Sequence, residues 1–247
     1  MSTFNKTSRL LGVAFIFQFV TSFGSGVFLQ PALIVPGDIG ETMIRIAQHP
    51  ALMQASILVD MLTALGVIFL GAMLFVTVRG VHEKLALTAL AFYVLEGALL
   101  AASRSDAFTL LRISQEYAGA GQPAALRAMA ALTLESGHFV GSTLHMLACC
   151  AGAILFYSLL ARSGAVPRWM SLWGLIAIIP LLITTLLSMF DYQAPFGVGL
   201  PYVPFELVVG VWLLIKGTPE PAPAPRGSSV PEKTREMLFE NQGVRGT

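Results

Sequence analysis

The sequence predicts an all-α, polytopic membrane protein: a bundle of six transmembrane helices with an extended outer hairpin between the third and fourth. Of the 247 residues, 55% are hydrophobic and only 12% are charged, whereas soluble domains carry roughly 25% charged residues. The mean hydropathy is +0.73. Long apolar runs recur along the chain, each near the roughly 20 residues that a helix needs to cross the hydrocarbon core.

The apolar runs define the expected helices, at about residues 9–30, 53–78, 85–105, 138–161, 169–190 and 200–216. The first run follows Lys6 and Arg9, as in a secretory signal peptide. However, its apolar character continues to Leu29 and no clean small-residue cleavage site follows. We therefore expect a retained first helix and a transmembrane domain over residues 1–217.

Two outer connections are longer than tight turns. Residues 37–49 favour a short interfacial helix. Residues 104–137 keep a helical pattern that is broken only around Gly119, Gly121 and Pro123, so we expect helices three and four to continue beyond the bilayer as a hairpin. The tail, residues 218–247, opens with alternating Pro and Ala and is then polar. We expect it to be disordered and cytoplasmic, with a short helix around 232–241.

Basic residues predict the orientation, because cytoplasmic loops are enriched in Lys and Arg. All but four of the 15 lie before the first helix, in the second–third and fourth–fifth connections, or after the sixth helix. The exceptions are Arg45, Arg104, Arg112 and Arg127. With an even number of crossings, both termini are expected in the cytoplasm and the protein in the cell (inner) membrane.

Several classes of function have no motif here. No basic block suggests nucleic acid as a partner, and no Gly-rich phosphate loop, nucleophile elbow or CxxC motif is present. Cys149 and Cys150 are adjacent, so on a helix they point about 100° apart; we interpret them as packing residues. No cofactor is expected. The expected partner is the lipid bilayer, and the oligomeric state is left open.

Ionisable residues within the apolar runs are the candidate site, because such side chains are costly in a membrane and normally face the protein interior or water. By helical rise, all of them fall in the outer half of the membrane or at its middle, including the one on helix six. They are Asp60, Glu96, Arg104, Glu135, His138, His145 and Glu206.

Helical spacing places smaller polar residues beside them. On helix four, Glu135, His138, Ser142, His145, Cys149 and Gly152 share one stripe. Helices one, two and six carry similar polar faces around Gln18, Asp60 and Glu206. Four such faces predict an outward-facing polar cavity.

Other interpretations remain open at this stage. Stripes of small residues usually mark helix contacts, Glu135 could form a structural ion pair with Arg104, and His145 could be a hydrogen-bonded core residue.

Metal binding is the sharper alternative. Glu135-x-x-His138 has the spacing found in di-metal helix bundles, but those use two such motifs and two further carboxylates. Only one is present, so no metal is expected; His138 and His145 are the candidate ligands if one binds.

A family resemblance covers about Thr7 to Thr218. The residues that carry it are LFYSLLARSGAVPRWMSLWGLIA at 155–177 and PFELVVGVWLLIKG at 204–217. The chain resembles a bacterial membrane family known as domain of unknown function 4386. The resemblance implies a bacterial six-helix membrane protein, and it implies no activity, ligand or catalytic residue.

Three hypotheses for function follow. The first is small-molecule or ion-coupled transport or binding, with a solute in the outer cavity and a proton or ion on Asp60, Glu96 or Glu206. The second is a regulatory or interaction partner that acts through its tail. The third is an intramembrane enzyme on a hydrophobic substrate, possessing a base or metal ligand at His138 or His145; the sequence leans against an enzyme.

Overall fold

The computed structural model describes residues 3–190, 192, 196–199 and 201–217. Every regular element in these ranges is a helix, and six segments are long and apolar enough to cross a membrane. The prediction of an all-α, six-span membrane protein is confirmed. The tail at 218–247, with its expected helix at 232–241, lies outside the described residues.

The helices follow the expected order, and most run longer than their apolar cores. The first span combines α1 (Thr3–Gly24), η1 (Ser25–Leu29) and α2 (Gln30–Leu33). It is followed by α3 (Ile39–Gln48), α4 (Pro50–Val78) and α5 (Glu83–Gly119). The fourth span combines α6 (Ala124–His138), η2 (Phe139–Leu144) and α7 (His145–Ser163). The chain ends with α8 (Arg168–Ser188), η3 (Phe196–Gly199) and α9 (Val203–Lys216).

Local sequence explains several of these boundaries. The Asp38 side chain accepts a hydrogen bond from the Glu41 backbone N–H at 3.0 Å and caps α3. Pro50 opens α4, where the missing N–H costs nothing. Gly164 ends α7 with a φ of +69°, a conformation that glycine adopts without steric penalty. The short helix expected within 37–49 is therefore present as α3; its position at the membrane interface stays a prediction.

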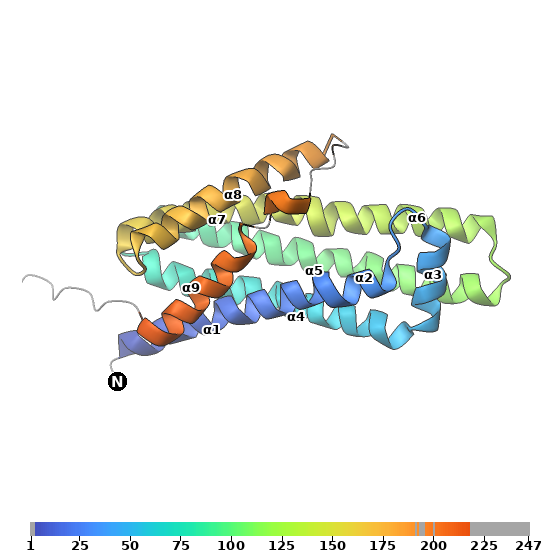
Figure 1. Ribbon diagram of the computed structural model, residues 1–247, viewed down its shortest axis with the longest axis horizontal. Coiled ribbons are helices and arrows are strands. Elements are labelled where there is room, and N and C mark those ends of the chain that lie inside the picture. The colour runs from blue at the N-terminus through green and yellow to red at the C-terminus, as the bar shows by residue number, and fades with distance from the viewer. Residues whose placement is uncertain (1–2, 191, 193–195, 200, 218–247) are drawn as a thin grey trace, which may run out of the picture.

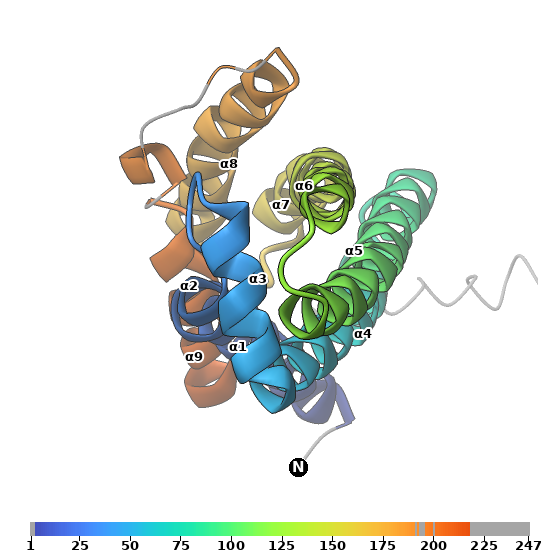
Figure 2. The same ribbon diagram turned by 90° about the vertical axis from the view of Figure 1, so that its right-hand side faces the viewer.

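The six spans form a closed ring. Each packs against its neighbour in the order α1, α4, α5, α7, α8, α9, and α9 returns to α1. Figure 2, which looks along the bundle, shows α3 lying across one end of this ring. We call that end the hairpin end and the opposite end, where α1 begins and α9 finishes, the terminal end (Figure 1).

Glycines bring some helices into direct contact. A Cβ on Gly12 would lie 2.8 Å from the Gly210 carbonyl oxygen, so α1 and α9 pack backbone to backbone. A Cβ on Gly174 would lie 2.5 Å from the ring of Phe205, which holds α9 against α8. Small residues at helix contacts are typical of membrane bundles, because close approach strengthens dispersion forces.

The longest helices form the hairpin. With 37 residues in α5 and 40 in the α6–α7 span, each extends well past the roughly 30 Å of a hydrocarbon core at 1.5 Å per residue. Residues 120–123 join them, and the Ser136 hydroxyl donates to Asp106 across the pair at 3.0 Å. The helical extension to Gly119 and from Ala124 agrees with the sequence pattern, and its projection beyond the membrane stays a prediction.

The last span is the shortest, as expected, and its helix starts at Val203 rather than at about residue 200. Helix α9 has only 14 residues, or about 21 Å. Its start lies against the first turns of α8, because the Trp173 indole N–H donates to the Pro201 carbonyl at 3.1 Å. Figure 1 shows α9 reaching the bundle near the middle of α1. The expected position of Glu206 in the outer half of the membrane stays a prediction.

Two apolar clusters pack the ring, one toward each end. The larger, at the terminal end, includes fully buried Phe15, Leu74, Phe156 and Leu213. The smaller, at the hairpin end, packs α3 against α5 around Met43, Ile46 and Leu111. Asp60, Glu96, His145 and Glu206 lie around a cavity between these clusters.

Candidate functional site

A polar cavity lies inside the ring, between the two apolar clusters. Its volume is about 380 Å³. We call it the central cavity, and α1, η1, α4, α5, α7, α8 and the segment around α9 all contribute to its wall. The polar residues of its lining are Gln18, Ser22, Ser25, Gln30, Asp60, Thr63, Glu96, His145, Cys149, Tyr202 and Glu206.

Four residues singled out in the sequence meet in this cavity. Asp60 comes from α4, Glu96 from α5, His145 from the start of α7 and Glu206 from α9. The polar faces expected on helices one, two, four and six thus surround one space. What these residues do there stays a prediction.

A second, smaller cavity of about 120 Å³ lies next to it, toward the hairpin end. We call it the vestibule. Its lining includes Ser56, Arg104, Asp106, His138 and Ser142. The vestibule and the central cavity share four lining residues, which are Gln30, Asp60, Leu100 and Gly141. The two spaces therefore meet at a common wall.

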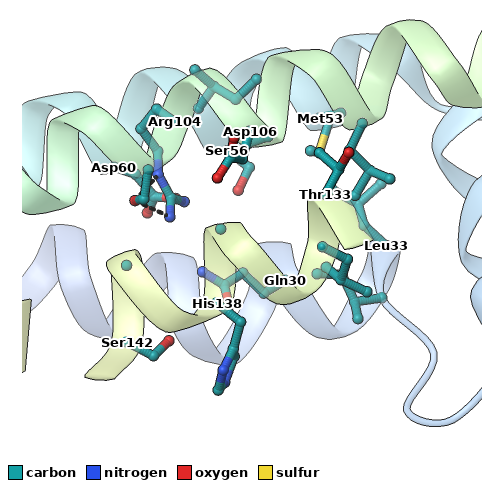
Figure 3. A pocket seen from close by; sticks show the side chains of 18 of the residues that line it. Gln30, Leu33, Met53, Ser56, Asp60, Arg104, Asp106, Thr133, His138 and Ser142 are labelled. Atoms are coloured by element: carbon teal, nitrogen blue, oxygen red, sulfur yellow. Dashed lines mark hydrogen bonds and ion pairs between the residues drawn. The ribbon is translucent and has the colours of Figure 1, made fainter. Parts of the chain in front are cut away.

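Asp60 and Arg104 form an ion pair at this wall. The Arg104 guanidinium donates to Asp60 Oδ2 and also contacts the Ser103 hydroxyl, with Nη2–Oγ at 2.8 Å. Both side chains are largely buried: that of Arg104 is 14% exposed and that of Asp60 is 7% exposed. Figure 3 shows the two side chains pointing toward each other from α5 and α4. The sequence analysis considered Glu135 as the partner of Arg104, and that pairing is wrong.

Gly141 makes room for this pair. A Cβ at Gly141 would lie 2.5 Å from Ser103 Oγ and 2.7 Å from Arg104 Nη2. Gly141 belongs to η2, a π-helical stretch inside the long α6–α7 span. A second π-helical stretch, η1, contributes Ser25 to the central cavity. Such stretches are rare and occur frequently at functional sites, and here both lie at the same site.

Five buried side-chain polar atoms have no hydrogen-bond partner in the described structure, and four of them belong to residues that line the central cavity. These four are Gln18 Oε1, Ser25 Oγ, Glu96 Oε2 and His145 Nδ1. Gln18, Ser25 and Glu96 are 8%, 1% and 6% exposed. Buried polar groups in folded proteins nearly always have a partner, and water or a solute inside the cavity would supply one.

Charge in the central cavity is not balanced. Among the described residues, the three ion pairs involve Asp60, Glu41 and Asp38, and none involves Glu96 or Glu206. No Lys or Arg is found among the described residues that line the central cavity. Two carboxyl groups thus face the cavity without a neighbouring cation.

Two tyrosines that the sequence analysis missed connect to Glu206. The Tyr202 hydroxyl donates to Glu206 Oε1 at 3.1 Å, and it lies 2.8 Å from the Tyr157 hydroxyl. Tyr157 is fully buried on α7 and belongs to the apolar cluster of the terminal end. The four-residue spacing of Tyr202 and Glu206 could have indicated the first contact; nothing local in the sequence indicates the second.

The remaining candidates lie elsewhere. Glu135 and His138 line an open groove between α6 and the α2–α3 connection. His138 also reaches the vestibule, but its imidazole points away from the Asp60–Arg104 pair (Figure 3). His145 belongs to a different cavity from Glu135, whereas His138 and Glu135 line the same groove; a role of either His as a base or metal ligand stays a prediction. No three His, Cys, Asp or Glu side chains of the described ranges lie close enough to hold a metal ion.

Cys149 and Cys150 occupy different surroundings. Both are free and buried, as expected for residues that point in different directions on one helix. Cys149 lines the central cavity, whereas Cys150 is fully buried in the apolar cluster of the terminal end.

Comparison with known proteins agrees with this architecture. Searches of curated proteins and of solved structures give no match. A family model described as domain of unknown function (DUF4386) matches residues 10–217. That match covers every residue of the central cavity and all but the start of the six spans. Its six apolar spans make the chain a multi-pass membrane protein, and the chain is a member of the DUF4386 family.

Proposed function

We propose that the protein is a small-molecule transporter of the cell membrane, in which the central cavity binds a solute and Glu96 and Glu206 bind the coupling proton or ion. The observation that carries this proposal is the central cavity itself. It lies midway through a membrane bundle, holds about 380 Å³, and is faced by four buried polar atoms without partners.

The cost of these atoms supports a bound molecule. An unpaired polar group is more costly in a membrane than elsewhere, because lipid offers no hydrogen bonds. Four such groups on the walls of one cavity would be retained most readily if a solute or water pairs with them. The volume falls in the range of roughly 300–1,000 Å³ typical of small-molecule sites.

The carboxyl groups support coupling. Ionisable residues inside membrane spans commonly mark proton or ion pathways. Asp60 is already paired with Arg104, whereas Glu96 and Glu206 have no ion pair in the described structure. They are therefore the groups free to exchange a proton or cation as the solute binds and leaves.

The layout supports access from one side. The vestibule adjoins the central cavity toward the hairpin end, and the apolar cluster around Phe156 and Leu74 closes the terminal end. Together with the distribution of Lys and Arg, this arrangement supports a cavity that opens outward and termini that lie in the cytoplasm. Transport would require the wall at Asp60 and Arg104 and the apolar cluster to open in turn.

Proteoliposomes that contain the full chain and a trapped pH-sensitive dye test the proposal. Cationic, zwitterionic, neutral and anionic solutes are added in turn, and the internal pH is followed. We expect at least one class to drive a proton flux that Glu96→Gln abolishes and that Glu116→Gln, an exposed change on the same helix, leaves intact. Absence of any Glu96-dependent flux across all four classes would overturn the proposal.

A further inference from the structure

We propose that the solute of the central cavity is an organic cation, an ammonium group carried on an apolar body. This inference rests on the proposed function and names the chemical class that the cavity fits. It follows from the charge of the wall, from the kind of polar atom left without a partner, and from the apolar remainder of the lining.

The charge of the wall favours a cation. Glu96 and Glu206 face the central cavity from α5 and α9, and within the described ranges neither pairs with a Lys or Arg. The Arg104 guanidinium at the cavity wall is already bound to Asp60 and Ser103. An anionic solute would meet two carboxyl groups and no free cation. A positively charged group placed between Glu96 and Glu206 would be attracted to both, and the low dielectric of the membrane interior strengthens that attraction.

The unpartnered atoms give a second, independent indication. Gln18 Oε1 and Ser25 Oγ also line the cavity, are buried and have no hydrogen-bond partner in the described structure. With Glu96 Oε2, they present three oxygen atoms that can accept, from α1, η1 and α5, and the fourth unpartnered atom, the imidazole Nδ1 of His145, can accept or donate. An ammonium group carries N–H donors and no acceptor. It therefore matches the cavity in hydrogen bonding as well as in charge.

The rest of the lining sets the character of the solute's body. Phe19 and Phe23 stack with their ring centres 5.2 Å apart, and both line the cavity beside Leu100, Met146 and Leu181. Aromatic faces also attract cations directly. A compact hydrophilic ion would leave these side chains without contacts, whereas an amine with an aromatic or aliphatic body covers them.

A bare metal cation fits less well. Carboxylate and carbonyl oxygens suit hard cations, which take six or more ligands. Within the described ranges, no group of three acidic, His or Cys side chains is close enough to form such a shell. The acceptors of the central cavity are spread over its walls, as a polyatomic ligand requires.

Three probes of matched shape and different charge test this inference: 4-phenylbutylamine, 4-phenylbutanol and 4-phenylbutyrate. Their binding to the purified full chain in detergent micelles is measured by titration calorimetry. We expect the amine to bind at least about tenfold more tightly than the alcohol, equivalent to about 1.4 kcal/mol, and the carboxylate to bind weakest. Glu96→Gln should remove the advantage of the amine over the alcohol, and Glu116→Gln should preserve it.

The outcomes separate this inference from the proposed function. Equal or tighter binding of the alcohol or the carboxylate, or no binding of the amine, would overturn the proposal that the solute is an organic cation. If an anionic or neutral solute drove Glu96-dependent flux in proteoliposomes, the transporter proposal would stand while the ligand class fell. If Glu96→Gln failed to fold, Glu206→Gln would replace it. The comparison of the three probes on the unaltered chain would still decide whether the cavity prefers a cation.

Discussion

Asp60 on α4 and Arg104 on α5 form a buried ion pair in the wall that separates the vestibule from the central cavity. They are 44 residues apart in the sequence. The pair joins α4 and α5, which make the most extensive helix–helix contact of the ring. It also neutralises Asp60, one of the three acidic residues of the central cavity. The pair therefore affects both the stability of the fold and the access of a solute to the central cavity.

Removing one partner of this pair should be strongly destabilising, because the other charge is then left buried and alone. We expect Asp60→Asn or Arg104→Gln to cost about 3 kcal/mol, measured by thermal or denaturant unfolding in micelles. The double variant should recover part of this loss. Strictly additive losses in the double variant would show that the two side chains do not interact.

Gly141 should tolerate no side chain, since a Cβ there would overlap Ser103 Oγ and Arg104 Nη2. Gly141→Ala is expected to lower stability by about 1–3 kcal/mol through overpacking. Gly24→Ala is the matched control, because no atom lies within 4 Å of its added Cβ. Equal stability of the two variants would mean that η2 does not approach Arg104 as described.

The hydroxyl chain from Glu206 to Tyr157 gives a third prediction. Tyr202→Phe removes the donor to Glu206 and the partner of Tyr157. A hydrogen bond between membrane helices contributes about 0.6 kcal/mol on average, so we expect a small loss of stability with a larger loss of proton flux. Tyr192→Phe, a change at an exposed ring, is the control. Unchanged flux in Tyr202→Phe would exclude a role for this chain in coupling.

The orientation can be tested by single cysteines in a chain that lacks Cys149 and Cys150. We expect a cysteine at Ala120, in the connection between α5 and α6, to react with a membrane-impermeant maleimide in intact cells. A cysteine at Gly80, in the α4–α5 connection, should react only after the membrane is opened. The reverse pattern would place the hairpin in the cytoplasm and contradict the distribution of Lys and Arg.

The fold follows from the sequence because each span carries its own signal. Apolar length is a local property, so the helices around Leu70 or Ile178 could be placed without knowing their neighbours. The shortness of α9 was indicated as well, because Pro201 and Pro204 lie at its start. Its packing was not, because that depends on the contacts of Trp173 and Phe205 with segments far away in the chain.

The candidate site was predictable only in part. The cost of burying a charge identified Asp60, Glu96, His145 and Glu206 one by one, and helical periodicity showed which way each faces. Which acid pairs with Arg104 depends on the rotation and depth of two helices, and the sequence does not encode that in any local pattern. The partner is Asp60 rather than Glu135 because α4 packs along α5 at the depth of Arg104.

The central claim is that water or a solute reaches the polar cavity inside the ring, and the two adjacent cysteines test it most directly. In proteoliposomes, the Cys150→Ala variant retains Cys149 in the cavity wall, and Cys149→Ala retains Cys150 in the apolar cluster. A small methanethiosulfonate reagent is predicted to label Cys149 many times faster than Cys150, and a solute that binds the cavity is predicted to slow that labelling. Equal labelling of the two thiols, or none at Cys149, would contradict the account.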